Sequence, residues 1–441
     1  MQHHRWFLAV SIILVFETAM HRTIATAQSI ADTATAADPS KHLGQVDLWK
    51  LDEQYQVPTM RWLDQQSAIR SLLYSGPRYR GESTEVFAFY ASPATLDPSQ
   101  AGKKFPGVVL IHGGGGTAFA EWAYLWAKRG YAAIAMDLSG SRPIDPVYGE
   151  SGVPKPGQAN APSTRQRLPN GGPDQGHPEK FDTIGGDVSD DWPWHAVANC
   201  IRAHSLLRSF PEVNSDRTAV TGISWGGYTT CLVASLDDRF QAAVPVYGCG
   251  FLYEGESVQK PAIDKLADRR EAWIRSYDPS SWLSRCKVPI LWVNGTNDVH
   301  YPLDSYQKSF DVVPGKNKWM RIEVQMRHSH PAGWAPAEIG YFIDSFCGLG
   351  ESLPNPGEIG INDDSVQVGY LSRLPLKEAA IHYTIEDGLR SQRKWITLSA
   401  QVSDQKIVAP KPPSQANTWF VSMTDARGAM VTTPIRFQPA P

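Results

Sequence analysis

Residues 218–232 read TAVTGISWGGYTTCL, and this stretch decides the fold that the sequence predicts. An apolar strand leads into the pattern G-x-S-x-G, and a helix-compatible segment follows it. Such a sharp strand-to-helix turn brings the backbone close to itself, so side chains at Gly222 and Gly226 would clash. The turn would lift the Ser224 hydroxyl out of the sheet edge, where the following helix adds the positive end of its dipole. We therefore interpret Ser224 as a nucleophile.

The flanking sequence alternates short apolar strands with amphipathic helices. We predict strands at 108–111, 132–136, 218–221, 242–246, 288–293 and 320–325, and helices at 118–129, 194–207, from 226, 257–275, 303–310 and 336–346. This alternation predicts βαβ units and a mainly parallel sheet covered on both faces, the α/β doubly wound class. A β-hairpin over 68–74 and 85–90 is expected to precede it.

The chain divides into three predicted parts. A basic start, an apolar run over 6–16 and the triplet Ala25-Thr26-Ala27 indicate a signal peptide over 1–27. An uncleaved anchor is the alternative. Residues 28–350 are expected to form the catalytic domain, with an extension over 28–84 and inserts over 140–191 and 248–283 above the site. Short strands with turn signals predict a small all-β sandwich over 351–441. The protein is therefore expected to be secreted or periplasmic, with no membrane contact after cleavage.

Composition excludes several classes of function. The 441 residues contain 42 Lys and Arg against 45 Asp and Glu. The protein therefore lacks the excess of positive charge that would attract a nucleic acid. The five cysteines are widely and irregularly spaced, which excludes a zinc site or a disulfide framework. Cys249 with Cys286 is the disulfide to test first, and buried free thiols are the alternative. We expect neither a metal nor an organic cofactor.

A serine nucleophile needs a base and an acid to orient that base. In this architecture both follow the serine along the chain, each after a later strand. Asp298 follows the strand at 288–293, whereas Asp304, its rival, falls within the next helix. Two histidines follow the strand at 320–325. We favour His330 as the base because it lies further past the strand end, with His328 as its competitor.

Backbone N–H groups should stabilise the oxyanion formed in acyl transfer. One is expected from Trp225, the residue after the nucleophile. The other is expected from the glycine run that follows His112, with Gly114 preferred and Gly113 or Gly115 as alternatives. A dinucleotide-binding loop is the competing interpretation, but the spacing G-x-G-x-x-G fails here.

Three further side chains are candidates for the substrate pocket. They are His112, Trp192 and Trp334. The two tryptophans could stack on sugar rings or on an aromatic acyl group, and aromatic packing beneath loops is the alternative.

Four segments together resemble the α/β-hydrolase superfamily: IHGGGG (111–116), GISWGG (222–227), GTNDVHYP (295–302) and HSHPAGW (328–334). More narrowly, residues 85–350 are similar to secreted acetylxylan-esterase-like enzymes related to dienelactone hydrolases and prolyl oligopeptidases. The resemblance implies the superfamily fold and serine hydrolase activity, with Ser224, Asp298 and His330 in the triad roles. The segment after 350 weakly resembles the immunoglobulin-like domains attached to such enzymes.

The sequence thus predicts a secreted serine esterase, with acetyl or related esters of plant polysaccharide as expected substrates. A prolyl-oligopeptidase-like peptidase is the first alternative, although only about 80 mature residues precede the catalytic part and no propeller can be recognised in them. A catalytically silent carbohydrate-binding protein is the second. Turnover of acetyl esters against X-Pro amides would separate the first two, and labelling of Ser224 would separate the third.

Overall fold

The central sheet carries the architecture, and its strand order follows directly from the pairing. The computed structural model describes residues 44–144, 165–176 and 178–438. In spatial order the sheet contains β1 (Met60–Asp64), β2 (Arg70–Ser75), β3 (Glu85–Ala91), β5 (Ala132–Met136), β4 (Phe105–Ile111), β8 (Val213–Ile223), β9 (Ala242–Val246), β10 (Ile290–Gly295) and β11 (Lys318–Glu323).

From β5 to β11 every neighbouring pair of strands is parallel, and the β1–β2, β2–β3 and β3–β5 pairs are antiparallel. The predicted α/β class and the predicted hairpin, which is β2 with β3, are confirmed. Strands β4, β5 and β9 are buried along their whole length. Such burial explains why they read as continuous apolar runs rather than as alternating ones.

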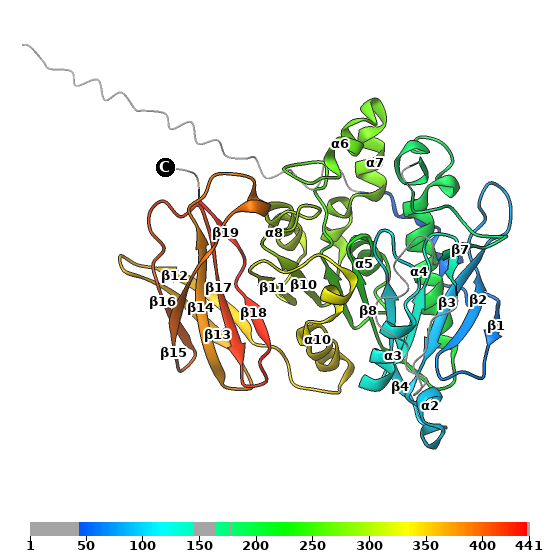
Figure 1. The fold of residues 1–441 in the computed structure, drawn as a ribbon, viewed down its shortest axis with the longest axis horizontal. Coiled ribbons are helices and arrows are strands. Elements are labelled where there is room, and N and C mark those ends of the chain that lie inside the picture. Colours follow the sequence, from blue (N-terminus) through cyan, green and yellow to red (C-terminus); the bar gives the residue numbers. More distant parts are fainter. Residues whose placement is uncertain (1–43, 145–164, 177, 439–441) are drawn as a thin grey trace, which may run out of the picture. The chain divides into compact units, whose positions relative to one another are not determined.

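Helices pack against this sheet in two pairs (Figure 1). Helix α3 (Ala120–Arg129) lies beside α10 (Ala337–Cys347), and the Arg129–Asp344 ion pair joins them. Helix α4 (Trp192–Ser209) packs against α5 (Trp225–Leu236), which starts directly after β8. Helix α8 (Leu303–Val312) connects β10 to β11, and the short α1 (Leu51–Gln54), α2 (Pro93–Leu96) and α9 (His330–Trp334) complete this part.

The two predicted inserts contact each other. The insert after β9 contains α6 (Lys260–Asp264) and α7 (Arg270–Tyr277), as predicted. The other insert contributes β6 (Ser141–Pro143), β7 (Arg165–Arg167) and a single π-helical turn over Pro178–Asp182. Arg269 donates to the carbonyls of Asp182 and Ile184 at 2.8 and 2.9 Å, and so ties the inserts together.

Strands after residue 354 form two sheets that share one strand (Figure 1). The first sheet contains, in order of pairing, β12 (Asn355–Ile361), β13 (Ser365–Leu371), β16 (Lys406–Pro410) and β15 (Ile396–Ser403). In the second sheet β15 pairs with β14 (Leu376–Thr384), and β14 pairs with β17 (Thr418–Asp425). β17 in turn pairs with β18 (Met430–Thr432) and β19 (Arg436–Phe437). The sequence missed β12, β13, β16 and β18; β16 and β18 are short, and β12 and β13 contain glycine.

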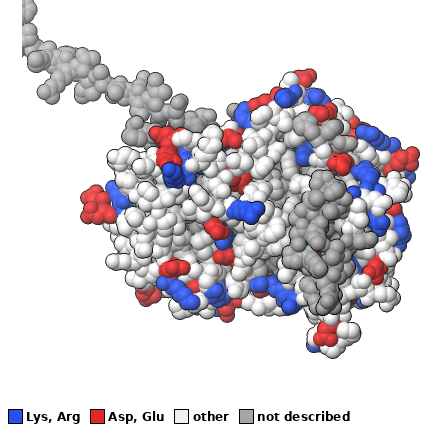
Figure 2. All heavy atoms as spheres, viewed as in Figure 1, with Lys and Arg blue, Asp and Glu red and all other residues white. Residues whose placement is uncertain are grey.

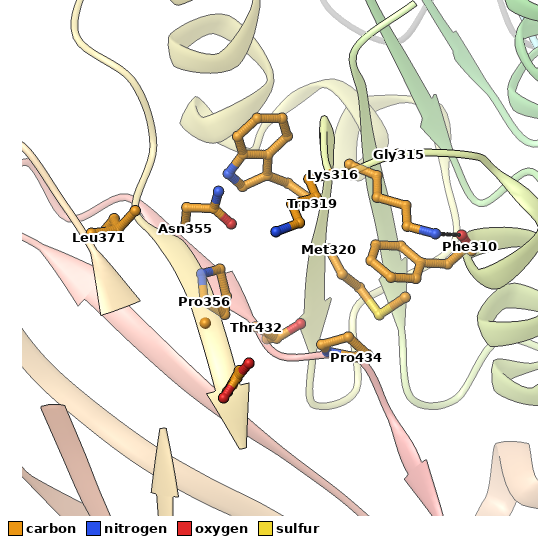
Figure 3. Close-up of a pocket in the computed structure, with 13 residues that line it drawn as sticks. Phe310, Gly315, Lys316, Trp319, Met320, Asn355, Pro356, Leu371, Thr432 and Pro434 are labelled. Carbon is orange, nitrogen blue, oxygen red and sulfur yellow. Dashed lines mark hydrogen bonds between the residues drawn. The ribbon is translucent and has the colours of Figure 1, made fainter. Parts of the chain in front are cut away.

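The C-terminal strands are joined to the central sheet. Thr432 of β18 pairs with Met320 of β11, and the backbone N–H of Met430 donates to Glu338 of α10 at 2.8 Å. Phe310, Trp319, Asn355 and Leu371 border a groove of about 460 Å³ at this junction (Figure 3). β18 therefore extends the edge of the central sheet. The described residues all belong to one compact unit.

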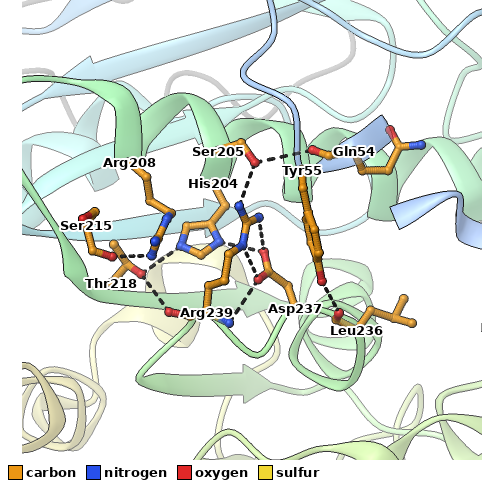
Figure 4. A network of polar contacts seen from close by, with 10 residues as sticks. All are labelled: Gln54, Tyr55, His204, Ser205, Arg208, Ser215, Thr218, Leu236, Asp237 and Arg239. Atoms are coloured by element: carbon orange, nitrogen blue, oxygen red, sulfur yellow. Dashed lines mark hydrogen bonds and ion pairs between the residues drawn. The ribbon is translucent and has the colours of Figure 1, made fainter. Parts of the chain in front are cut away.

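A buried polar network ties α4 to the sheet (Figure 4). His204 contacts Asp237 at 2.7 Å and Thr218 at 2.8 Å, and Arg239 binds the same carboxylate. The His204 and Asp237 side chains are fully buried. Burial lowers the pKa of His204 to about 4, so the ring is neutral and Arg239 is the cation that balances Asp237.

All five cysteines are buried free thiols. The suggested Cys249–Cys286 disulfide is therefore wrong, and the alternative interpretation is correct. Small apolar thiols fill space in a close-packed interior without forming a bridge.

On the face drawn in Figure 2, positive and negative side chains are interspersed.

Candidate active site

The turn between β8 and α5 holds Ser224 in a strained conformation. Its φ and ψ are 60° and −119°, a region that few non-glycine residues occupy. A Cβ at Gly222 would lie 2.2 Å from the carbonyl oxygen of Gly226, and one at Gly226 would lie 2.0 Å from that of Ile111. The glycines are therefore required by close backbone approach, as the sequence predicts.

His328 is the histidine that contacts the nucleophile. Its Nε2 lies 3.0 Å from Ser224 Oγ, and its Nδ1 lies 2.6 Å from Asp298 Oδ2. Because Nδ1 donates to the carboxylate, Nε2 is left as the acceptor for the serine proton. Three distant segments thus form one chain of hydrogen bonds.

The preference for His330 as the base is wrong. Its Nε2 accepts a hydrogen bond from the backbone N–H of Gly113 at 2.9 Å. Strand β11 ends at Glu323, two residues earlier than predicted, so His328 already lies well out on the loop. Ser329 caps α9, and His330 is the first residue of that helix.

A signal in the sequence could have identified this arrangement. Serine followed two residues later by proline is typical of a helix N-cap and the first helical turn. Ser329 and Pro331 occupy those positions, and the Ser329 hydroxyl accepts from the N–H of Ala332 at 3.2 Å. His328 is therefore the last loop residue before the helix.

Asp298 is held in place by the loop that carries it. Its Oδ1 accepts the backbone N–H groups of His300 and Tyr301 at 2.8 and 2.9 Å, which leaves Oδ2 for His328. Its rival Asp304 lies in α8, where its carboxylate contacts Arg390 at 3.6 Å. The structure therefore selects Asp298.

Aromatic rings that the sequence did not single out fix the plane of His328. Tyr247, directly after β9, stacks on the imidazole with centroids 4.4 Å apart, and Tyr301 lies parallel to it at 6.4 Å. The Tyr247 hydroxyl donates to the carbonyl of Arg327 at 2.6 Å. Nothing in the local sequence marks Tyr247, because it meets His328 only through the packing of β9 beside β10.

The glycine loop after β4 lies against the nucleophile. A Cβ at Gly113 would meet the Ser224 Cβ at 2.9 Å, and one at Gly114 would meet the Trp225 ring at 2.9 Å. The N–H of Gly113 is already bonded to His330, which removes it as an oxyanion donor. Trp225 is the first residue of α5, so its N–H has no intrahelical acceptor. Trp225 and Gly114 stay the predicted donor pair.

His330 and His112 hold this loop. Burial, with His112 and His328 nearby, lowers the pKa of His330 to about 3, so its ring is neutral and can accept from Gly113. His112 is buried; its Nε2 accepts from the N–H of Leu138 at 2.8 Å and its Nδ1 donates to the carbonyl of Gly113 at the same distance. His112 is therefore a loop anchor rather than a pocket residue.

The two tryptophan candidates do not face the nucleophile. Trp192 is fully buried, donates to the carbonyl of Leu138 at 2.6 Å and packs against the side of Trp225. Trp334 contacts Phe119 and Trp122 and borders a separate groove between α3 and α10. Aromatic packing, the alternative to sugar stacking, describes both.

Two properties of the described residues bear on other classes of site. They contain no group of three or more His, Cys, Asp and Glu side chains that could hold a metal ion. Across the same ranges, no helix combines the length and apolar character needed to cross a membrane. The predicted signal peptide over 1–27 lies outside the described residues.

Comparison with known proteins finds one matching family model and one relative. The model of the Prolyl oligopeptidase family matches residues 170–344. An uncharacterized peptidase, YuxL, from Bacillus subtilis (strain 168) is 26% identical over 223 residues, which are 47% of this chain but only 28% of that relative.

Comparison with solved structures finds similarity at low sequence identity. The acetyl xylan esterase from Paenibacillus sp. R4 has a TM-score of 0.51 and 19% identity, and the match covers 70% of this chain and 98% of that one. A Pyrococcus horikoshii acylaminoacyl peptidase is matched at 17% identity and a TM-score of 0.44, over 67% of this chain and 43% of that one. The chain has an α/β-hydrolase-like fold, and its Ser-His-Asp hydrogen bonds have the geometry on which serine hydrolases rely.

Proposed function

We propose that the protein is a serine hydrolase of carboxylic esters, with Ser224, His328 and Asp298 as its catalytic triad. The observation that carries this proposal is the continuous chain of hydrogen bonds from Ser224 Oγ through His328 to Asp298, at 3.0 and 2.6 Å. A strained serine at a strand-to-helix turn beside a glycine loop supplies the rest of an acyl-transfer site.

The reaction follows from these contacts. Ser224 Oγ attacks the ester carbonyl while its proton passes to His328 Nε2, and Asp298 stabilises the imidazolium that forms. The carbonyl oxygen becomes an oxyanion facing the N–H groups of Trp225 and Gly114. Collapse breaks the bond to the alcohol, which leaves with the proton from His328. Water then attacks the acyl-enzyme by the same route and releases the acid, so every step uses groups of the chain itself.

Acetyl or related esters of plant polysaccharide are the proposed substrate class. The likeness to an acetyl xylan esterase supports this choice. The test is a panel of chromogenic acetyl, butyryl and feruloyl esters together with acetylated xylan. Release of acetate by the wild type and its loss in Ser224→Ala would support the proposal. No turnover of any ester by folded wild-type protein would refute it.

A peptidase is the second candidate. The match to the Prolyl oligopeptidase family and the similarity to a protein named as a peptidase favour it. Both reactions use one acyl-enzyme mechanism, so fluorophosphonate labelling of Ser224 cannot separate them. The ratio of kcat/KM for an acetyl ester to that for an X-Pro amide can. We expect the ester to dominate, and a higher value for the amide would reassign the function.

We further propose export with removal of residues 1–27. The basic start, the short apolar run and the small-residue triplet support this proposal. N-terminal sequencing of the protein recovered outside the cytoplasm should begin at Gln28. An intact Met1 on exported or membrane-bound protein would contradict cleavage.

A further inference from the structure

Lys180 places its ammonium group over the ring of Trp225, the residue that follows the nucleophile, and forms no ion pair with a described carboxylate. Its Nζ lies 4.4 Å from the centre of the Trp225 ring and 5.4 Å from that of Trp192. No carboxylate of the described residues forms an ion pair with it, and none of their oxygens accepts a hydrogen bond from Nζ. Among the described residues, the ammonium therefore lies over the faces of two indole rings without a direct ion pair.

The environment makes this arrangement costly unless something else binds the ammonium. Burial lowers the pKa of Lys180 to about 8, so the cation still predominates at neutral pH. Asp174, the carboxylate that acts on it, is exposed and accepts the backbone N–H of Gly176 at 2.8 Å instead. An ammonium group has three donors, and leaving them unpaired in a desolvated place carries a penalty.

The position of Lys180 relates it to the reacting ester. Trp225 carries a proposed oxyanion donor, and its ring lies against Gly114, which carries the other. A second cation, Arg165, borders the same loop and donates to the carbonyl of Gly116 at 2.9 Å, also without a carboxylate partner among the described residues. The insert over 140–191 therefore places one cation over the Trp225 ring and a second one against the glycine loop.

We propose that Lys180 forms a carboxylate-binding subsite beside the oxyanion loop, so that the enzyme prefers esters carrying a carboxylate close to the scissile bond. This inference rests on the proposed function and narrows its substrate class. The carboxylate could belong to the acyl group, as in a dicarboxylic acid hemiester, or to the alcohol, as in an acetylated uronic acid. An oxygen of the carboxylate would accept from Nζ in place of water, and charge-assisted bonds of this kind are short and strong.

The test compares matched charged and neutral substrates. For the acyl side, the pair is 4-nitrophenyl hydrogen adipate and 4-nitrophenyl hexanoate. For the alcohol side, it is acetylated glucuronic acid and acetylated glucose. We expect kcat/KM of the wild type to favour the charged member of at least one pair by about tenfold or more, since hydrogen bonds to charged groups exceed neutral ones. The pair that shows the preference identifies which side of the ester carries the carboxylate.

Variants of Lys180 separate recognition from structure. Lys180→Met should lower kcat/KM for the charged substrate by about tenfold or more and leave the neutral one within about threefold. Lys180→Arg should keep most of the preference. Lys128→Met is the matched control, because Lys128 also lies over an aromatic ring, that of Tyr124 at 5.7 Å, but on α3; it should change neither rate.

Two outcomes would overturn the proposal. One is a wild type that turns over neutral esters without any preference for charged ones. The other is Lys180→Met lowering both rates equally, which would make the lysine a structural clamp between the indoles. Turnover of the neutral ester also reports whether the variant is folded. Failure of the proposed function is a different result, in which the wild type hydrolyses neither member of either pair.

Discussion

Replacing each of the two neighbouring histidines, His328 and His330, by alanine in turn gives a direct test of the site. We expect His328→Ala to remove the base, because His328 Nε2 is the group 3.0 Å from Ser224 Oγ. His330→Ala should leave that contact intact. It removes only the acceptor that holds the N–H of Gly113 at 2.9 Å.

The expected magnitudes differ widely. Loss of the base from such a triad lowers kcat by on the order of 10⁴ to 10⁶. Loss of the His330 acceptor strands one N–H, which costs about 1–3 kcal/mol. If all of that cost appeared in the transition state, kcat would fall about 5- to 150-fold. His330→Ala should therefore stay at least about tenfold more active than His328→Ala.

The assay is steady-state hydrolysis of a chromogenic acetyl ester, with the rate of fluorophosphonate labelling of Ser224 as a second measure. Circular dichroism and a thermal unfolding midpoint show whether each variant is folded. His328→Gln and His330→Gln serve as volume-matched controls, and His330→Gln keeps an acceptor for Gly113. A folded His330→Ala that is as inactive as His328→Ala, or a His328→Ala that labels at the wild-type rate, would refute this assignment.

Three other measurements test the fold around the site. Gly226→Ala would place a Cβ 2.0 Å from the carbonyl oxygen of Ile111, so we expect loss of activity with a lowered unfolding midpoint, and a wild-type midpoint would contradict the close approach. Burial lowers the pKa of His204 from its usual value near 6.5 to about 4 in the folded protein, so protons bind the unfolded chain more readily. Stability should fall by up to about 3 kcal/mol as the pH drops from 6.5 to 4, and His204→Gln should flatten this part of a pH series of urea unfolding curves. The five buried thiols should react with a thiol reagent only after denaturation; fewer than five reactive groups in denaturant without reductant would indicate a disulfide.

Much of the fold was predictable because the spacing of apolar residues along a strand or a helix can be read from the local sequence. The buried strands at 108–111 and 242–246 read as apolar runs, and the helices between them showed their periodicity, so the parallel α/β sheet followed. The C-terminal strands were harder. β12 contains a proline and two glycines and β13 contains a glycine, which weaken the local strand signal, and β13 also pairs with β16, which lies far along the chain.

The candidate site divides in the same way. Ser224 and Asp298 were predictable because each lies just after a strand, in a turn whose composition is specific. The base was not, because His328 and His330 are two residues apart and their difference depends on where α9 begins. The tryptophans were misjudged for a related reason, since an aromatic side chain looks the same in sequence whether it faces a pocket or the core.

The sequence by itself determined the nucleophile turn, the order of serine, acid and histidine, and the glycines without which the backbone could not close around Ser224. These features are marked by short sequence patterns, although the close contact at Gly226 is with Ile111 on the neighbouring strand β4. The tertiary structure alone decided which imidazole reaches Ser224, that Tyr247 stacks on it, and that Lys180 lies over Trp225. Those contacts join residues that are far apart along the chain, and only the packing of β9, β10 and the inserts brings them within a few ångströms of one another.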